Sequence, residues 1–145
     1  MSAADALPWQ ARLRKAADTC VLELPEPGIT MGSPGTPLVN GASQTGSTLV
    51  TDAWTSGYVI KEGKWIAVSV SSLIYLYQCT ADTTATGGAA SIPIQPMLRA
   101  APADNAALII NPAKIEGFVE IDGGALNITV ERIMAGCTFR IVERR

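Results

Sequence analysis

The feature that most limits the possible folds of this chain is the stretch from Gly35 to Trp54, which reads GTPLVNGASQTGSTLVTDAW. Turn-forming residues interrupt it at four places: Pro37, Asn40, Gly41 and Gly46. Between them lie short runs of β-forming residues at 38–39 and 48–51. This alternation is typical of a tight β-hairpin or meander. The stretch therefore predicts strands and displayed loops, and not a catalytic loop.

Turn signals continue along the chain at about the 8–12-residue spacing of an all-β sandwich or barrel. The predicted strands are residues 20–24, 38–39, 48–51, 58–60, 65–70, 73–80, 91–95, 107–111, 118–121, 126–133 and 137–142. Ser71-Ser72 and Asp122-Gly123-Gly124 predict hairpin turns. Pro93 predicts that its strand is an edge or contains a bulge, because proline cannot donate to a ladder. The predicted fold class is mainly β, a small antiparallel β-barrel or sandwich.

The first part of the chain predicts one α-helix, at about residues 3–17. Ser2 can cap it, and Leu7 and Leu13 can share one apolar face. With 145 residues, the chain has the usual size of one domain. We therefore predict a single β-rich domain over residues 1–145, with the helix followed by a β-module at about residues 20–143.

The composition is rich in apolar residues and poor in charge. Hydrophobic residues make up 48% and charged residues only 17%, whereas a soluble domain carries about a quarter. Two interpretations fit, a subunit that hides much of its surface against neighbours and a small, well-packed β-domain. The formal net charge of −2 gives no support to nucleic-acid binding. Arg140, Arg144 and Arg145 are interpreted as a solvated end or an interface charge.

No apolar run reaches the roughly 18 residues that a membrane span requires. The N-terminal sequence MSAADALPWQARLRKAAD also lacks the pattern of a signal peptide. We therefore expect a protein that is made in the cytoplasm, is not processed and does not insert into membranes. Cys20, Cys79 and Cys137 are odd in number and far apart, which favours buried or half-buried thiols over a bridge within or between subunits.

The sequence offers little for catalysis, and we expect neither an enzyme nor a cofactor or metal. Histidine is absent, so a Ser/His/Asp triad and a Cys/His dyad are excluded. Neither of the glycine-rich motifs that bind phosphate, GxGxxG and GxxxxGK(S/T), occurs in the sequence. Glu116, Glu120 and Asp122 lie close together, but solvated or interface carboxylates are the favoured interpretation over an acid–base pair.

Aromatic residues gather in the middle of the chain: Trp54, Tyr58, Trp65, Tyr75 and Tyr77. Such clusters serve more often as core and interface anchors than as ligand grooves. A groove that binds sugars or stacks bases remains the alternative. Since Tyr75 and Tyr77 are two residues apart, they are predicted to face one side of their strand, and Leu76 the other.

Over roughly residues 33–110 the chain resembles the distal tail and tail-tip hub proteins of tailed bacteriophages. The matching residues are Gly35, Pro37, Val39, Asn40, Gly41, Ala42, Gln44, Thr45, Gly46, Leu49, Asp52, Trp54, Lys61, Gly63, Tyr75, Pro96, Arg99, Ala100, Ala101, Pro102 and Asp104. The chain departs from the pattern at Ala53, where the family has glycine, and at Lys64, where it has aspartate. Family members usually carry additional β-structure before the helix.

The resemblance implies a structural virion protein of the phage tail tip or baseplate, assembled in the host cytoplasm. It would form a homo-oligomeric ring of six or three copies and contact the tail tube, the hub and the tape measure protein. The residues expected to carry assembly are Val39, Asn40, Gln44, Trp54, Arg99 and Asp104. Arg99 and Asp104 are expected either to pair and fix their loop or to bind a neighbour.

Two other virion functions stay open. The first is a receptor- or carbohydrate-binding β-module that uses Trp54, Trp65 and the face of Tyr75 and Tyr77. The second is a head decoration protein, which copy number per particle would separate from a tail protein.

Overall fold

The computed structural model describes residues 19–26, 30–121 and 139–143, and the regular elements in these ranges are all β-strands. The prediction of a mainly β fold is therefore confirmed, while the helix predicted at about residues 3–17 lies outside the described residues. The chain divides into two compact units. One comprises residues 22–115, and the other has 19–21, 116–121 and 139–143 as its described residues. The single domain over residues 1–145 stays a prediction.

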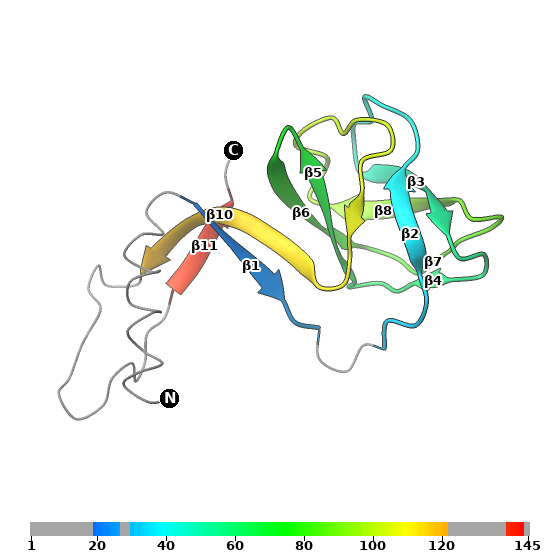
Figure 1. Ribbon diagram of the computed structural model, residues 1–145, viewed down its shortest axis with the longest axis horizontal. Helices are drawn as coiled ribbons and strands as arrows, with labels where there is room; N and C mark the ends of the chain where they lie inside the picture. Colours follow the sequence, from blue (N-terminus) through cyan, green and yellow to red (C-terminus); the bar gives the residue numbers. More distant parts are fainter. Residues whose placement is uncertain (1–18, 27–29, 122–138, 144–145) are drawn as a thin grey trace. The chain divides into compact units, whose positions relative to one another are not determined.

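Eleven strands are described, and they form three sheets. In chain order they are β1 (Cys20–Leu24), β2 (Gly35–Val39), β3 (Thr48–Trp54), β4 (Val59–Ile60), β5 (Trp65–Val70), β6 (Leu73–Cys79), β7 (Thr83–Thr84), β8 (Ala90–Gln95), β9 (Leu108–Ile109), β10 (Ala113–Ile121) and β11 (Phe139–Glu143). The six-stranded sheet has the order β2-β3-β8-β6-β5-β9, the three-stranded sheet β1-β10-β11, and β4 pairs with β7 (Figure 1).

The six-stranded sheet curls into a nearly closed barrel, because its two outer strands meet. Leu38 at the end of β2 forms an antiparallel bridge with Ala107, just before β9. On either side of this bridge, the Val39 N–H donates to the Ala106 carbonyl and the Asn105 N–H donates to the Val39 carbonyl, both at 2.9 Å. These bonds satisfy backbone groups that would otherwise stand open at the sheet edges. Of the two predicted architectures, the barrel is therefore the one observed.

Strands β5 and β6 of the barrel present one face to its core and the other to a smaller apolar layer. On β6, Tyr75 and Tyr77 belong to the main core cluster, whereas Leu76 belongs to a second cluster with Ala67 and Ala113. The predicted orientation of Tyr75 and Tyr77 to one side, and of Leu76 to the other, is confirmed. Alternation of side chains along a strand accounts for this division.

The predicted hairpin of residues 65–80 is confirmed. Strands β5 and β6 pair in an unbroken antiparallel register from Trp65↔Gln78 to Val70↔Leu73. The two turn residues, Ser71 and Ser72, have φ values of 50° and 67°. Positive φ at both central positions gives the backbone twist that a two-residue hairpin requires.

The position of β8 corrects the sequence prediction. Proline 93 predicted an edge or a bulge, but β8 lies inside the sheet between β3 and β6. β3 pairs with residues 90–93 and β6 pairs with residues 94–95, so Pro93 stands where one ladder ends and the other begins. The Pro93 carbonyl still accepts from Thr80 N–H at 3.0 Å. Pro93, which has no N–H to donate, is thus accommodated where β8 changes from one partner to the other.

In the second unit, β10 and β11 pair antiparallel from Gly117↔Glu143 to Ile121↔Phe139. A last strand is thus present, as predicted. The hairpin turn predicted at Asp122-Gly123-Gly124 and the strand predicted after it, at residues 126–133, lie outside the described residues. At Gly117 a Cβ atom would lie 2.2 Å from the Val142 carbonyl oxygen, so only glycine allows this close approach.

Candidate assembly surface

The loop between β2 and β3 is held in one conformation by the side chain of Gln44. Its Nε2 donates hydrogen bonds to the backbone carbonyls of Asn40 (2.8 Å), Gly41 (3.0 Å) and Val50 (2.9 Å). Its Oε1 accepts from the Val50 N–H at 2.7 Å. The side-chain amide thus replaces backbone partners that the turn removes from the ladder, which fixes the loop.

A second loop, residues 96–106, docks onto the first. Asp104 Oδ1 accepts a hydrogen bond from the Gly41 N–H at 2.8 Å, across 63 positions of sequence. The Ser43 N–H donates to the Pro102 carbonyl at 3.1 Å. Because the first of these bonds ends on a carboxylate, it is stronger than a bond between neutral groups. The two loops therefore form one continuous feature of the barrel.

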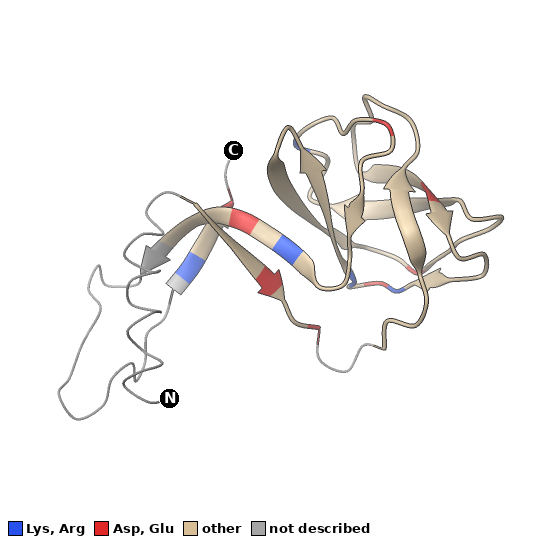
Figure 2. Cartoon of the chain, viewed as in Figure 1, with Lys and Arg blue, Asp and Glu red and all other residues tan. Residues whose placement is uncertain are grey.

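We call the feature formed by residues 40–48 and 95–105 the loop surface. It carries Met97, whose 61% exposure is the highest among the large hydrophobic side chains of the described residues. The following residue, Leu98, donates its N–H to the Gly46 carbonyl at 2.8 Å, which ties Met97 to the first loop. Residues 40–48 contain no charged side chain (Figure 2). Met97 is thus an exposed apolar side chain that is held next to an uncharged loop.

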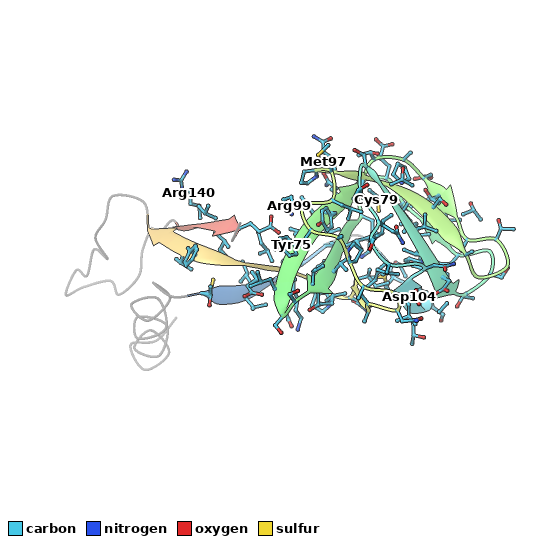
Figure 3. The ribbon with its side chains drawn as sticks, turned by 90° about the horizontal axis from the view of Figure 1, so that it is seen from above. Tyr75, Cys79, Met97, Arg99, Asp104 and Arg140 are labelled. Atoms are coloured by element: carbon cyan, nitrogen blue, oxygen red, sulfur yellow. The ribbon has the colours of Figure 1, made fainter. Side chains whose placement is uncertain are left out.

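Arg99 belongs to the loop surface, and its side chain spreads over two tyrosine rings of β6. Figure 3 shows Arg99 next to one of them, Tyr75. Its Cζ is 5.7 Å from the ring centroid of Tyr75 and 5.2 Å from that of Tyr77. A guanidinium nitrogen also donates to the Leu76 carbonyl at 2.6 Å. The cation–π contacts and this bond fix the direction of the charge. Arg99 and Asp104 thus each have partners of their own within the barrel.

The structure brings together four of the residues expected to carry assembly, since they all lie in the loop surface: Asn40, Gln44, Arg99 and Asp104. Two others lie in the barrel core instead. Val39 is fully buried, and Trp54 is only 5% exposed. Their side chains support the barrel from inside, so a direct contact with a partner would fall to their neighbours. Sequence reasoning did not single out Met97, although its place beside the matching Pro96 and Arg99 was a usable signal.

Burial also bears on the proposed sugar-binding groove. Trp54, Tyr75 and Tyr77 are buried, and Trp65 is half-buried against the second apolar cluster. Trp54 stacks on Tyr58 inside the main core, with ring centroids 5.5 Å apart and planes inclined by 17°. A ring that binds a sugar must offer a free face to the solvent. These aromatic side chains therefore serve the core.

The sequence did not predict the buried ion pair of Lys64 and Glu26. Their side chains are only 6% and 10% exposed, and Lys64 Nζ contacts Glu26 Oε2. The other carboxylate oxygen, Oε1, accepts from the Trp65 N–H at 2.9 Å. Burial, and secondarily the charge of Glu26, raises the pKa of Tyr58. The pair joins the segment before the first long loop to the start of β5.

The cysteines agree with the prediction of buried or half-buried thiols where they are described. Cys79 is buried in the barrel core and Cys20 is half-buried, both as free thiols, while Cys137 lies outside the described residues. Burial raises the pKa of Cys20. Burial also raises the pKa of Cys79 to about 12, although the Lys64 ammonium acts in the opposite direction. A thiol this deep in an apolar core is a poor nucleophile.

The raised pKa of Cys79 predicts a loss of stability in alkali. Its ordinary value is 9.0, so above that pH the unfolded chain releases a proton that the folded chain keeps until about 12. Stability from this group is full below 9.0 and is lost as the pH rises towards 12. By about pH 10 the loss amounts to about 1 kcal/mol. Urea unfolding of the wild type and Cys79→Ala should therefore converge with rising pH; a constant difference would contradict the shift.

No group of three or more His, Cys, Asp or Glu side chains suited to a metal ion occurs within residues 19–26, 30–121 and 139–143. Glu116 is half-buried in β10, whereas the side chains of Glu120 and Asp122 are outside the description. Among the described residues, no helix has the length and hydropathy needed to cross a bilayer.

Comparison with known proteins adds no family. No family model matches this chain. No curated protein matches it either. The interpretation of function therefore depends on the sequence resemblance and on the geometry of the loop surface.

Proposed function

We propose that this chain is a structural virion protein of a tailed bacteriophage and forms part of a ring at the tail tip or baseplate. One observation carries the proposal: more than half of the residues that match the tail proteins lie in the loop surface. Gln44 fixes the first loop, and Asp104 joins the second loop to Gly41. The matching pattern thus describes a rigid surface and not a set of reactive groups.

A ring places specific demands on its subunit. Each copy must present one surface to a different surface of the next copy, so that the contacts close. Order in the free subunit lowers the entropy lost when the contact forms. The loop surface meets the second need, because the hydrogen bonds of Gln44 and Asp104 set the loop conformation before any partner arrives. We propose the loop surface, with its exposed Met97, as one of the two surfaces of the contact.

The first test is the mass of the purified protein in solution, by light scattering, with and without reductant. A closed trimer or hexamer of the 15.2 kDa chain is the expected result. If reductant changes the mass, one of the cysteines Cys20, Cys79 and Cys137 takes part in the contact. A monomer at every concentration and in both conditions would count against a self-assembling ring.

The substitution Met97→Glu tests whether the loop surface forms the contact between subunits. A charge at this 61% exposed apolar side chain is expected to weaken assembly by at least tenfold, because the carboxylate would lose its water in the contact. The matched control is Val59→Glu, which places the same charge on the 39% exposed Val59 of β4. Equal assembly of the two variants would contradict a role for the loop surface. Arg99→Ala should also reduce assembly and virion yield.

The place of the protein in the particle needs a second measurement. Quantitative mass spectrometry of purified particles is expected to find the chain at a handful of copies and cross-linked to tail tube, hub or tape measure proteins. Hundreds of copies per particle would instead indicate a head decoration protein. Absence of the chain from purified particles would refute both a tail protein and a head decoration protein.

A further inference from the structure

Asn40 and Gly41 form an asparagine–glycine pair at the start of the loop that follows β2, with Asn40 exposed and Gly41 half-buried. In such a pair the backbone nitrogen of the glycine can attack the asparagine side chain, because glycine has no Cβ to hinder it. Asparagine is for this reason among the thermolabile residues of proteins. A position in a turn and on the surface normally favours the reaction, so the structure around Gly41 decides its rate here.

We propose that Asn40 is a deamidation site whose reaction is held back by Asp104. In the reaction the Gly41 nitrogen loses its proton and attacks Asn40 Cγ. A new C–N bond forms, the bond from Cγ to Nδ2 breaks, and ammonia leaves. Water then opens the resulting succinimide at either carbonyl and leaves aspartate or isoaspartate in place of Asn40. The inference is independent of the proposed function.

The hydrogen bond of Gly41 to Asp104 opposes the first step. The Gly41 N–H, which must be lost, donates to Asp104 Oδ1 at 2.8 Å. Breaking a hydrogen bond to a charged group has a larger cost than breaking one between neutral groups. The carboxylate also repels the negative charge that develops on the nitrogen. Both effects slow the attack, since they act on the nucleophile itself.

The peptide groups on both sides of the reacting atoms are fixed as well. The Asn40 N–H donates to the Val50 carbonyl at 3.0 Å, and Gln44 Nε2 donates to the carbonyls of Asn40 and Gly41. Ring closure requires these groups to rotate until the nitrogen faces Cγ in attack geometry. These hydrogen bonds resist such a rotation, so the folded loop restricts the motion that the attack requires.

The reaction would alter the loop surface if it occurred. It would add a negative charge at position 40, close to the carboxylate that holds Gly41. Like charges at short range repel each other. The contact between the two loops would weaken, so Asp104 protects the surface that it also builds.

The test follows deamidation of the full-length protein by peptide mapping and an isoaspartate assay at mildly alkaline pH. Asp104→Ala is expected to deamidate at Asn40 at least about tenfold faster than the wild type, the factor given by loss of one charge-assisted hydrogen bond. Asp104→Asn should lie between them, because an amide oxygen accepts without the charge. Asp82→Ala is the matched control, since that exposed carboxylate accepts from the Glu62 N–H at 2.8 Å elsewhere on the barrel.

An equal rate in the wild type and Asp104→Ala would overturn the proposal. A slower rate in Asp104→Ala would also overturn it, because Asp104 would then act as a base for the reaction. Circular dichroism before incubation shows whether each variant is folded. The same chains in urea give the reference rate without structure, and the folded wild type is expected to react more slowly than this reference at Asn40.

Discussion

Lys64→Met, with Glu26 retained, is expected to lower the free energy of unfolding by about 3–5 kcal/mol. The reason is that the substitution leaves a carboxylate buried without its cation, in a place where the Glu26 side chain is only 10% exposed. The remaining bond from the Trp65 N–H to Glu26 Oε1 satisfies one oxygen but cannot neutralise the charge. Urea unfolding followed by tryptophan fluorescence measures the change.

The matched variants separate the charge from the packing. Glu26→Gln should cost a similar amount, because it leaves the Lys64 ammonium, in a side chain only 6% exposed, without its counter-ion. Lys64→Met combined with Glu26→Leu should recover most of the loss, since two apolar side chains need no partner. Single variants that each cost less than about 1 kcal/mol would mean that the pair behaves like an exposed one.

Local signals in the sequence were sufficient for the strands but not for their order. Ser71 and Ser72 stand between two clear strands, and the predicted hairpin is present. The Gly35–Trp54 stretch likewise gives two paired strands, although β2 begins at Gly35 and not at Leu38. Pro93 misled the prediction because its effect depends on which neighbours its strand has. Closure of the barrel between Leu38 and Ala107 depends on residues far apart in sequence.

The loop surface was predictable only where its residues interact within one turn. Asn40 and Gln44 act within one turn, so a pattern of turn residues reveals them. Asp104 was included through the resemblance, while its contact with Gly41 spans 63 positions and appears only in the fold. The ion pair of Lys64 and Glu26 spans 38 positions, and an isolated charge gives no local sign that it will be buried. Side-chain direction also escaped prediction, which is why two residues that are buried in the core, Val39 and Trp54, were included among the expected assembly residues.

Trp54→Ala is expected to lower the free energy of unfolding by about 3–5 kcal/mol, as is usual when a large buried aromatic side chain is removed. Trp54 is 5% exposed and stacks on Tyr58, so the substitution leaves a cavity and removes a ring contact. The indole N–H also donates to Thr51 Oγ1 at 2.8 Å, and that hydroxyl donates to the Ala90 carbonyl at 2.8 Å. Urea unfolding followed by far-UV circular dichroism measures the loss.

Two smaller substitutions divide this loss into packing and hydrogen bonding. Trp54→Phe keeps a ring against Tyr58 and leaves only the acceptor of Thr51 unused, so it should cost less than Trp54→Ala. Thr51→Val should cost about 1–3 kcal/mol, because it leaves the buried indole N–H and the Ala90 carbonyl without this partner. The double variant Trp54→Phe/Thr51→Val should lose less stability than the sum of the losses in the two single variants, since both substitutions remove the same hydrogen bond. Additive losses of stability would contradict the hydrogen bond between Trp54 and Thr51. If folded Trp54→Phe fails to assemble, Trp54 has a role in the contact between subunits.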